Sequence, residues 1–129
     1  MKPRGSKDNR PVNLELTTIK FPITALASIS HRVTGILLFV SSVLLVWALD
    51  ASLASEESFN QLVKLLSSTG AKFVLWAFLV IFSYHALAGI RHLIMDVGIG
   101  EDFKGGALGA RILFVASALA AVAWGIVLW

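Results

Sequence analysis

Three long runs of uncharged, mostly apolar residues dominate the chain, and shorter polar segments separate them. The runs cover Val33–Leu49, Phe73–Ile90 and Ile112–Trp129. An α-helix rises about 1.5 Å per residue, so each run, with its flanking residues, can cross a hydrocarbon core of about 30 Å. Lipid cannot form hydrogen bonds with backbone N–H and C=O groups, so we expect these segments to be helices, which satisfy those groups internally. The pattern predicts an all-α membrane protein.

The predicted spans form three antiparallel transmembrane helices (up-down-up), because only short connections join them. We place these helices at about residues 22–50, 71–97 and 107–129. Pro22 suits the first turn of the first helix, where a missing backbone N–H is tolerated. The helices together make a single transmembrane domain, residues 21–129, after a polar N-terminal segment, residues 1–20.

The first connection contains an amphipathic pattern that predicts a short additional helix. Ser55 is a suitable N-cap, and Glu56 and Glu57 follow in the first turn, where negative charge is favourable. Apolar residues then recur with helical spacing at Phe59, Leu62, Val63 and Leu66. We expect this helix to lie on the outer membrane surface and to end at Gly70.

The second connection is rich in glycine, which predicts an irregular loop. Its glycines are Gly98, Gly100, Gly105, Gly106 and Gly109. The third predicted span instead carries small residues at four-residue spacing, which favour a close approach to a neighbouring helix. These small residues are Ser117, Ala121 and Gly125.

The positive charges predict the orientation of the chain in the membrane. Of the 11 Lys and Arg residues, all except Lys64 and Lys72 lie before or early in the first helix, or around the second connection. Positive residues are enriched on the cytoplasmic side of membranes, so we expect a cytoplasmic N-terminus and an outer C-terminus. Four tryptophans fall near the outer helix ends, where an aromatic belt is expected: Trp47, Trp76, Trp124 and Trp129.

Composition supports the membrane assignment and argues against several kinds of function. The 129 residues are 57% hydrophobic and 15% charged, whereas about a quarter of residues are charged in average soluble domains. The net charge of +3 is compatible with acidic partners or a membrane surface, and the spanning runs make membrane lipid a partner. The chain has no basic face with interleaved aromatic residues, which argues against nucleic acid. The absence of cysteine excludes disulfides, Cys-bound iron–sulfur clusters and covalent haem attachment in this chain.

The second predicted span carries His85, Gly89, His92 and Asp96 at intervals of three or four residues, so they share one face. A neutral imidazole at His85 can be an axial ligand of haem iron, and Gly89 leaves room for a flat macrocycle. His85 and His92 are two turns apart, about 10 Å, so a second axial ligand has to come from another helix or chain. Alternatively, His85 is a packing residue that hydrogen-bonds a neighbouring helix, and His92 and Asp96 form a solvated pair at the interface.

Ser28, His31 and Arg32 converge on one face of the first predicted span. A hydroxyl and a guanidinium are hydrogen-bond donors, and a quinone presents two carbonyl acceptors. A charged donor also favours the negative charge that a quinone gains on reduction. Alternatively, His31 and Arg32 extend to the lipid headgroups and have no further role.

These residues fall within two motifs that resemble the larger cytochrome b anchor subunit of succinate dehydrogenase. The first motif is Ser28-x-x-His31-Arg32-x-Thr34, preceded by Arg10-Pro11-Val12, Leu16 and Ile23. The second motif is His85-x-x-x-Gly89-Ile90-Arg91-His92-Leu93-x-Met95-Asp96-x-Gly98. The two motifs occur in the family's order and on the expected helices.

The resemblance implies a second, similar membrane anchor subunit as a partner, with a flavoprotein and an iron–sulfur subunit bound to the pair. It implies one b-type haem shared between the two anchors, each supplying one axial histidine, which in this chain is His85. Ser28 and Arg32 match the family's quinone-binding positions at the cytoplasmic face. His31, His92 and Gly89 would then lie near the haem propionates and around the haem.

The function implied by the resemblance is that of a membrane anchor and electron-transfer subunit of succinate:quinone oxidoreductase. This enzyme is respiratory complex II, which links the tricarboxylic acid cycle to electron transport in the bacterial inner membrane. The chain alone would not be an enzyme, and its complex would reduce ubiquinone. The nearest alternative is the anchor of a quinol:fumarate reductase. A small multi-helix transporter or structural membrane protein is an alternative of another class, although proton-coupled transport favours a mid-membrane carboxylate that these spans lack.

Overall fold

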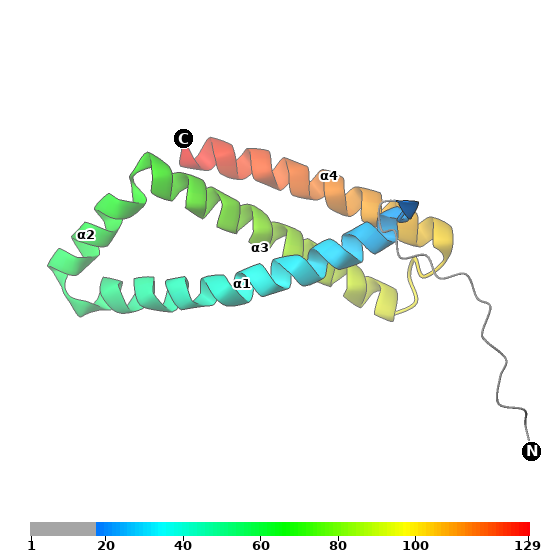
Figure 1. Ribbon diagram of the computed structural model, residues 1–129, viewed down its shortest axis with the longest axis horizontal. Helices are drawn as coiled ribbons and strands as arrows, with labels where there is room; N and C mark the ends of the chain where they lie inside the picture. Colours follow the sequence, from blue (N-terminus) through cyan, green and yellow to red (C-terminus); the bar gives the residue numbers. More distant parts are fainter. Residues whose placement is uncertain (1–17) are drawn as a thin grey trace, which may run out of the picture.

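The computed structural model describes residues 18–129, and within this range the regular elements are four α-helices (Figure 1). They are α1 (Ile23–Ala54), α2 (Glu56–Leu66), α3 (Thr69–Asp96) and α4 (Phe103–Leu128). Of the described helices, α1, α3 and α4 are long and apolar enough to cross a membrane, and successive ones run in opposite directions. The predicted fold of three antiparallel spanning helices is therefore confirmed. Residues 10–12 and Leu16 of the first motif lie outside the described residues.

Local sequence explains where α1 begins and ends. Pro22 is the N-cap of α1 rather than its first helical residue, and its carbonyl accepts hydrogen bonds from Ala25 N at 3.0 Å and Leu26 N at 3.2 Å. A proline costs no hydrogen bond here, because the N–H groups at a helix start have no partner inside the helix. The helix continues to Ala54, where extended backbone at Ser55 ends it.

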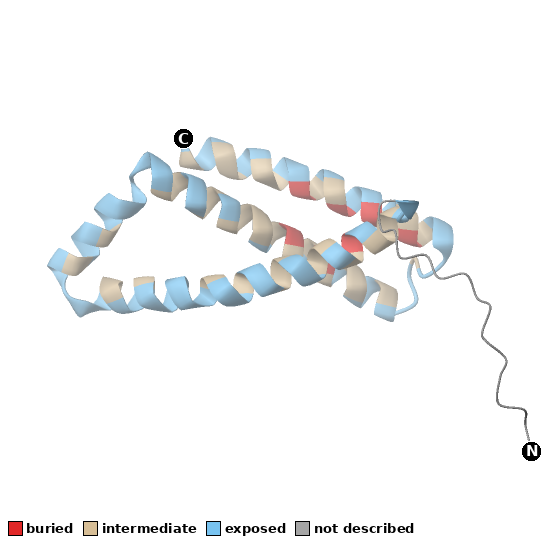
Figure 2. Cartoon of the chain, in the orientation of Figure 1, coloured by how far each residue is buried: buried red, intermediate tan, exposed pale blue. Residues whose placement is uncertain are grey.

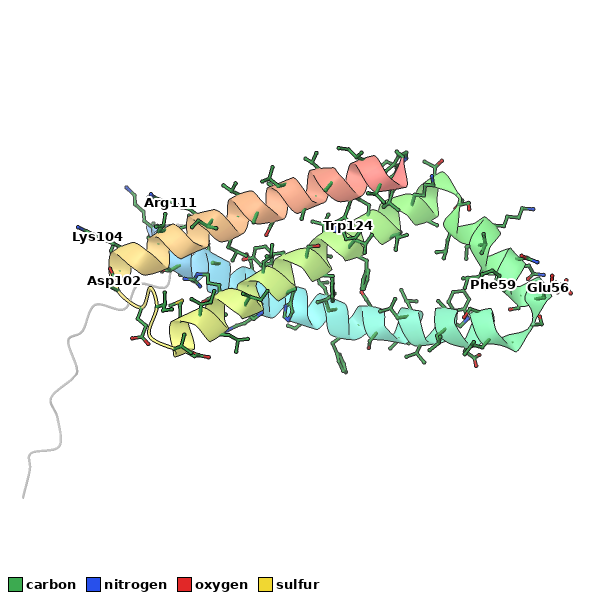
Figure 3. All side chains as sticks on the ribbon, turned by 180° about the vertical axis from the view of Figure 1, so that it is seen from behind. Glu56, Phe59, Asp102, Lys104, Arg111 and Trp124 are labelled. Atoms are coloured by element: carbon green, nitrogen blue, oxygen red, sulfur yellow. The ribbon has the colours of Figure 1, made fainter. Side chains whose placement is uncertain are left out.

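The short helix predicted in the first connection is confirmed as α2. The Ser55 hydroxyl caps its first turn, as the sequence predicts. Figure 3 shows Phe59 directed from α2 toward the side on which α1 and α3 lie, with Glu56 directed away from it. The predicted end at Gly70 is wrong, because Ser68 already caps the next helix and Gly70 lies inside α3.

The connection between α3 and α4 is shorter than its glycines predict. Gly98 and Gly100 form the turn with φ values of 86° and 73°, which residues with side chains rarely adopt. The prediction of an irregular loop is wrong for the other glycines, which lie in the first turns of α4: Gly105, Gly106 and Gly109. Asp102 caps α4, and a Cβ on Gly105 would be 2.6 Å from Asp102 Oδ1 and 2.8 Å from Gly100 Cα. Glycine at position 105 therefore permits the close approach of helix and turn.

The buried residues gather toward the end of the molecule that contains the α3–α4 turn (Figure 2). They are Ala27, Tyr84, Ala88, Gly106, Ala110, Leu113 and Ser117. Most of these residues are small, so the helix backbones can approach closely. The Tyr84 hydroxyl also donates a hydrogen bond of 3.0 Å to Ala27 O and joins α3 to α1. We call the part of the molecule around these residues the crossing end, and the part around α2, where α1 diverges from α3, the α2 end (Figure 1).

Toward the α2 end, side-chain hydrogen bonds join α3 to α4. Trp76 Nε1 donates to Ala121 O at 2.9 Å, and Trp124 Nε1 donates to Ser83 Oγ at 2.9 Å. A Cβ on Gly125 would be 3.7 Å from Trp76 Nε1, so the small-residue face of α4 packs against α3 as predicted. Two of the four tryptophans assigned to an aromatic belt thus have hydrogen-bond partners within the helix pair.

Candidate functional site

Three histidine side chains come together where α1 crosses α3. His31 of α1 lies between His85 and His92 of α3, with its ring centroid 4.2 Å from the first and 5.2 Å from the second. Ala27 and Ala88 are each 1% exposed, and their small side chains let the two helices approach at this point. The histidines that the sequence assigns to two separate helices therefore form one cluster.

His85 is held by hydrogen bonds from one of its two ring nitrogens to α1. Its Nδ1 lies 3.2 Å from Thr34 Oγ1 and 3.2 Å from His31 O. Thr34 Oγ1 itself lies 2.8 Å from Ser30 O and 2.9 Å from His31 O. No described residue forms a hydrogen bond with the other ring nitrogen, Nε2, and the side chain is half-buried. The sequence motif contained Thr34 but did not reveal this contact.

Two glycines on the facing sides of α1 and α3 flank the histidine cluster. A Cβ on Gly35 would be 3.0 Å from His85 Cε1, so the ring packs directly against the α1 backbone. A Cβ on Gly89 would meet His31 Nε2 at 3.9 Å as its nearest neighbour, so its surroundings are more open. The sequence motifs include Gly89 but not Gly35, although Gly35 stands one turn after His31.

Ser28 and Arg32 lie one turn apart on α1, beside the histidine cluster. Ser28 is half-buried, whereas Arg32 is exposed. The His31 ring lies against His85 and His92 of α3, whereas Arg32 is not part of this cluster. Within residues 18–129, Arg32 forms no hydrogen bond or ion pair. A charged group on a helix that spans lipid is costly unless it has a polar partner, so a partner from outside the chain is expected.

His92 and Asp96 do not form an ion pair in the described part of the chain. Asp96 is exposed at the last residue of α3, and His92 is half-buried one turn before it. The His92 ring instead lies near His31. His92 therefore belongs to the histidine cluster, and Asp96 stands apart from it.

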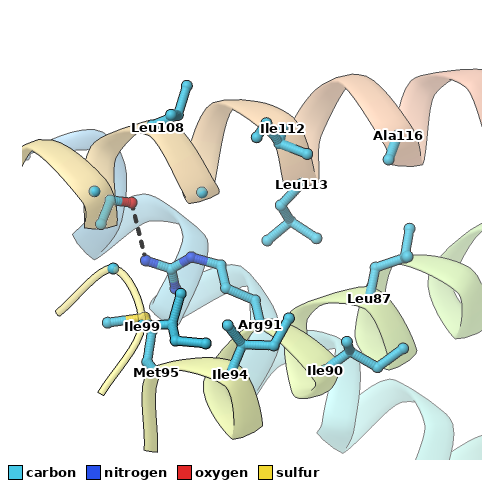
Figure 4. Close-up of a pocket in the computed structure, with 14 residues that line it drawn as sticks. Leu87, Ile90, Arg91, Ile94, Met95, Ile99, Leu108, Ile112, Leu113 and Ala116 are labelled. Carbon is cyan, nitrogen blue, oxygen red and sulfur yellow. Dashed lines mark hydrogen bonds between the residues drawn. The ribbon is translucent and has the colours of Figure 1, made fainter. Parts of the chain in front are cut away.

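A groove of about 400 Å³ lies between α3 and α4 at the crossing end (Figure 4). Its walls are aliphatic side chains and glycine backbone, and Arg91 is the charged residue among them. Arg91 Nη2 donates to Gly106 O at 3.1 Å, while Arg91 Nε is buried without a hydrogen-bond partner among the described residues. A Cβ on Gly109 would be 3.3 Å from that Nε, so the helical glycines of α4 accommodate this side chain. The second sequence motif contains Arg91 but does not reveal that this side chain joins α3 to α4.

Comparisons with known proteins cover almost the whole chain. A family model described as "Succinate dehydrogenase/Fumarate reductase transmembrane subunit" matches residues 6–125. The "Succinate dehydrogenase cytochrome b556 subunit" of Coxiella burnetii is 42% identical over 121 residues, which cover 93% of this chain and 97% of the relative. The protein of the same name from Paracoccus denitrificans is 31% identical over 124 residues, covering 91% and 90%. That of Rickettsia prowazekii is 38% identical over 97 residues, covering 75% of each chain.

Proposed function

Since the chain belongs to the succinate dehydrogenase/fumarate reductase transmembrane subunit family, as a cytochrome b subunit of succinate dehydrogenase, we propose specific roles for its polar residues. His85 is an axial ligand of a b-type haem, and Ser28 and Arg32 help to bind ubiquinone. The chain is a membrane anchor and electron-transfer subunit, and it does not itself contact succinate. The family model covers fumarate reductases as well, whereas the relatives named above are succinate dehydrogenase subunits, which favours quinone reduction.

The residues around His85 fit a haem. One ring nitrogen is bonded to α1, which leaves Nε2 for a metal, and neutral imidazole is a common haem ligand. His31 and His92 lie within the same cluster and can donate hydrogen bonds to haem propionates. Gly89 has no side chain, so it leaves space beside the cluster. A bound haem b supplies one-electron redox chemistry at this point.

The second axial histidine is proposed to come from a partner anchor subunit. The centroids of the His31 and His85 rings are only 4.2 Å apart and the ring planes are inclined by 31°, which leaves no space for iron between the two rings. His92 is about two turns along α3 from His85, which is too far to share one iron from the opposite side. His85 is only half-buried within this chain, which suits a haem shared between two subunits.

The observation that carries the haem proposal is the free Nε2 of His85 beside two further imidazoles. Replacing His85 by Leu keeps an apolar helix but removes the ligand, so the reduced b-type absorption band of the purified complex should be weak or absent. His92→Leu is the comparison variant, because it removes a proposed propionate contact but leaves the ligand in place, so a b-type band should persist even if it is weaker. An unchanged spectrum in His85→Leu would exclude His85 as the ligand and favour its packing role.

Ser28 and Arg32 are proposed to hold the quinone head, since the exposed guanidinium has no partner within the described chain. Ser28→Ala should weaken binding by about 0.5–1.5 kcal/mol, and Arg32→Leu by about 1.5–3 kcal/mol, because the second removes a charged donor. The measurement is the ratio of quinone-linked to dye-linked succinate oxidation in membranes. Ser42→Ala is the control, since its exposed hydroxyl bonds only to Phe39 O within its own helix. A normal ratio in both variants would move the quinone site to other subunits.

The proposed complex also contains the flavoprotein and the iron–sulfur subunit, bound on the cytoplasmic side of the bacterial inner membrane. Figure 3 places Lys104 and Arg111 at the crossing end, which supports a cytoplasmic position for the α3–α4 turn. Ser28 and Arg32 then lie near that face, and the C-terminus lies outside. A topology reporter inserted between Ile99 and Asp102 should report the cytoplasm, and one after Trp129 the opposite compartment.

A further inference from the structure

We propose that α1 determines which nitrogen of His85 is protonated and how its ring is oriented, with Thr34 and Gly35 as positioning residues for the iron ligand. This inference rests on the proposed ligation of haem iron by His85. The midpoint potential of the haem would then depend on the Thr34 hydroxyl and on the glycine backbone at position 35 of the neighbouring helix. Neither residue would touch the haem iron itself.

The hydrogen bonds around Thr34 determine which ring nitrogen of His85 carries the proton. A backbone carbonyl can only accept, so the His85 Nδ1 atom, 3.2 Å from His31 O, has to carry a hydrogen. The Thr34 hydroxyl has a single hydrogen, and two carbonyl oxygens lie at 2.8 Å and 2.9 Å to receive it. Its oxygen therefore presents a lone pair to His85 Nδ1 at 3.2 Å and accepts the same proton. Because neutral imidazole has one N–H, Nε2 keeps its lone pair for a metal.

The α1 backbone at Gly35 limits the position of the imidazole ring. A Cβ there would lie 3.0 Å from His85 Cε1, 3.7 Å from Nδ1 and 4.0 Å from Nε2. The ring edge between the two nitrogens therefore packs against glycine, and a methyl group would push the ring away. The hydroxyl and carbonyl hold one side of the ring, and the glycine sets its distance from α1.

This arrangement has an electronic consequence for bound iron. An imidazole that donates Nδ1–H to good acceptors is a stronger electron donor at Nε2. A stronger donor stabilises oxidised iron, which carries the additional positive charge, and so lowers the midpoint potential of the haem. Removal of one acceptor should weaken this effect and raise the potential. The predicted shift is a property of the α1 contact and does not depend on a change in the number of ligands.

The test uses the purified complex and compares Thr34→Val with Thr34→Ser. Valine has nearly the shape of threonine but cannot accept a hydrogen bond, whereas serine keeps the hydroxyl. Redox titration of the haem absorption band should show a higher midpoint potential in Thr34→Val and a wild-type value in Thr34→Ser. Loss of haem in the valine variant alone would also support the inference. Equal potentials in wild type and both variants, or equal loss of haem in both, would overturn it.

Gly35 is tested by the rate at which haem transfers from the complex to an excess of apomyoglobin. Outer contacts of metal-bound histidines typically change metal affinity by about 10–100-fold, so Gly35→Ala should release haem at least about tenfold faster. Gly125→Ala is the matched control, since it adds the same methyl group beside an aromatic ring at the α2 end. Equal rates in the two variants would exclude the positioning role of Gly35. If His85→Leu loses the haem band but the Thr34 and Gly35 variants behave as wild type, only this inference fails.

Discussion

The crossing end and the α2 end of this bundle use the same three apolar helices in different ways. At the crossing end, Ala110 is 0% exposed and the buried small residues bring α1, α3 and α4 together. At the α2 end, Val46 and Leu53 of α1 are 67% and 77% exposed, and α1 stands away from α3. Apolar side chains alone therefore do not hold these helices together, because a large aliphatic side chain is as stable in lipid as against a neighbouring helix. Small residues decide where the helices meet.

Polar contacts between the helices follow the same division. At the crossing end, hydrogen bonds join α1 to α3 through Tyr84 and His85, and α3 to α4 through Arg91. Toward the α2 end, the side-chain bonds join α3 to α4 through Trp76, Trp124 and Lys72. The residues with proposed chemistry lie where α1 is held in place, and the remainder of α1 presents an apolar surface. Such a surface suits contact with lipid or with a second anchor subunit.

The strongest test of this comparison adds volume at matched positions on α4. Ala110→Leu inserts a large side chain into the crossing end and should destabilise the fold by about 1–3 kcal/mol. Ala118→Leu makes the same change at an exposed position of the same helix and should have little effect. The free energy of unfolding can be measured by SDS titration in mixed micelles, followed by circular dichroism. Similar losses in both variants would contradict the role assigned to small residues.

A smaller effect is expected when one hydrogen bond between α1 and α3 is removed. Tyr84→Phe keeps the buried ring but loses the bond to Ala27 O, so the free energy of unfolding should fall by about 0.5–1.5 kcal/mol. The same titration measures it, with Ser41→Ala as a control that loses only an exposed bond within α1. If Tyr84→Phe is as stable as the control, close packing alone holds the crossing end together.

The smallest effect is expected at the α2 end. Lys72 Nζ donates to Leu128 O at 2.8 Å, at the carbonyl end of α4, where a positive charge is favourable. Lys72→Met should therefore reduce the free energy of unfolding by about 0.3–1 kcal/mol. Lys20→Met, at an exposed position before the start of α1, should not reduce it. A loss from Lys72→Met that equals or exceeds that from Ala110→Leu would reverse the ranking of the two ends.

Spanning helices and caps were predictable because each depends on nearby residues. An uncharged run long enough to cross lipid has few structures other than a helix, and Ser55 followed by two glutamates is a local capping signal. The histidine face of α3 was also predictable, since helical periodicity alone places His85 and His92 on one side. Their roles as ligand and neighbour of a haem stay predictions.

Contacts that depend on where two helices cross were not predictable from local pattern. Glycine marks both flexible turns and close helix approaches, so Gly98 and Gly105 gave the same signal although one lies in the turn and the other in α4. The packing of His31 against His85 and the bond from Arg91 to Gly106 O require the relative position of whole helices. Thr34 shows the same limit, because its partner is 51 residues away in sequence.

The bond between Tyr84 and Ala27 also has a consequence for biogenesis. The two residues are 57 positions apart, and a ribosome that adds about 5–20 residues per second needs roughly 3–11 s to synthesise the intervening chain. During that interval α1 enters the bilayer as a single helix whose one buried residue, Ala27, has no neighbour to pack against. The later insertion of α3 completes the contact. Nascent chains that stop before α3 would therefore leave α1 without this packing partner and open to quality-control proteolysis.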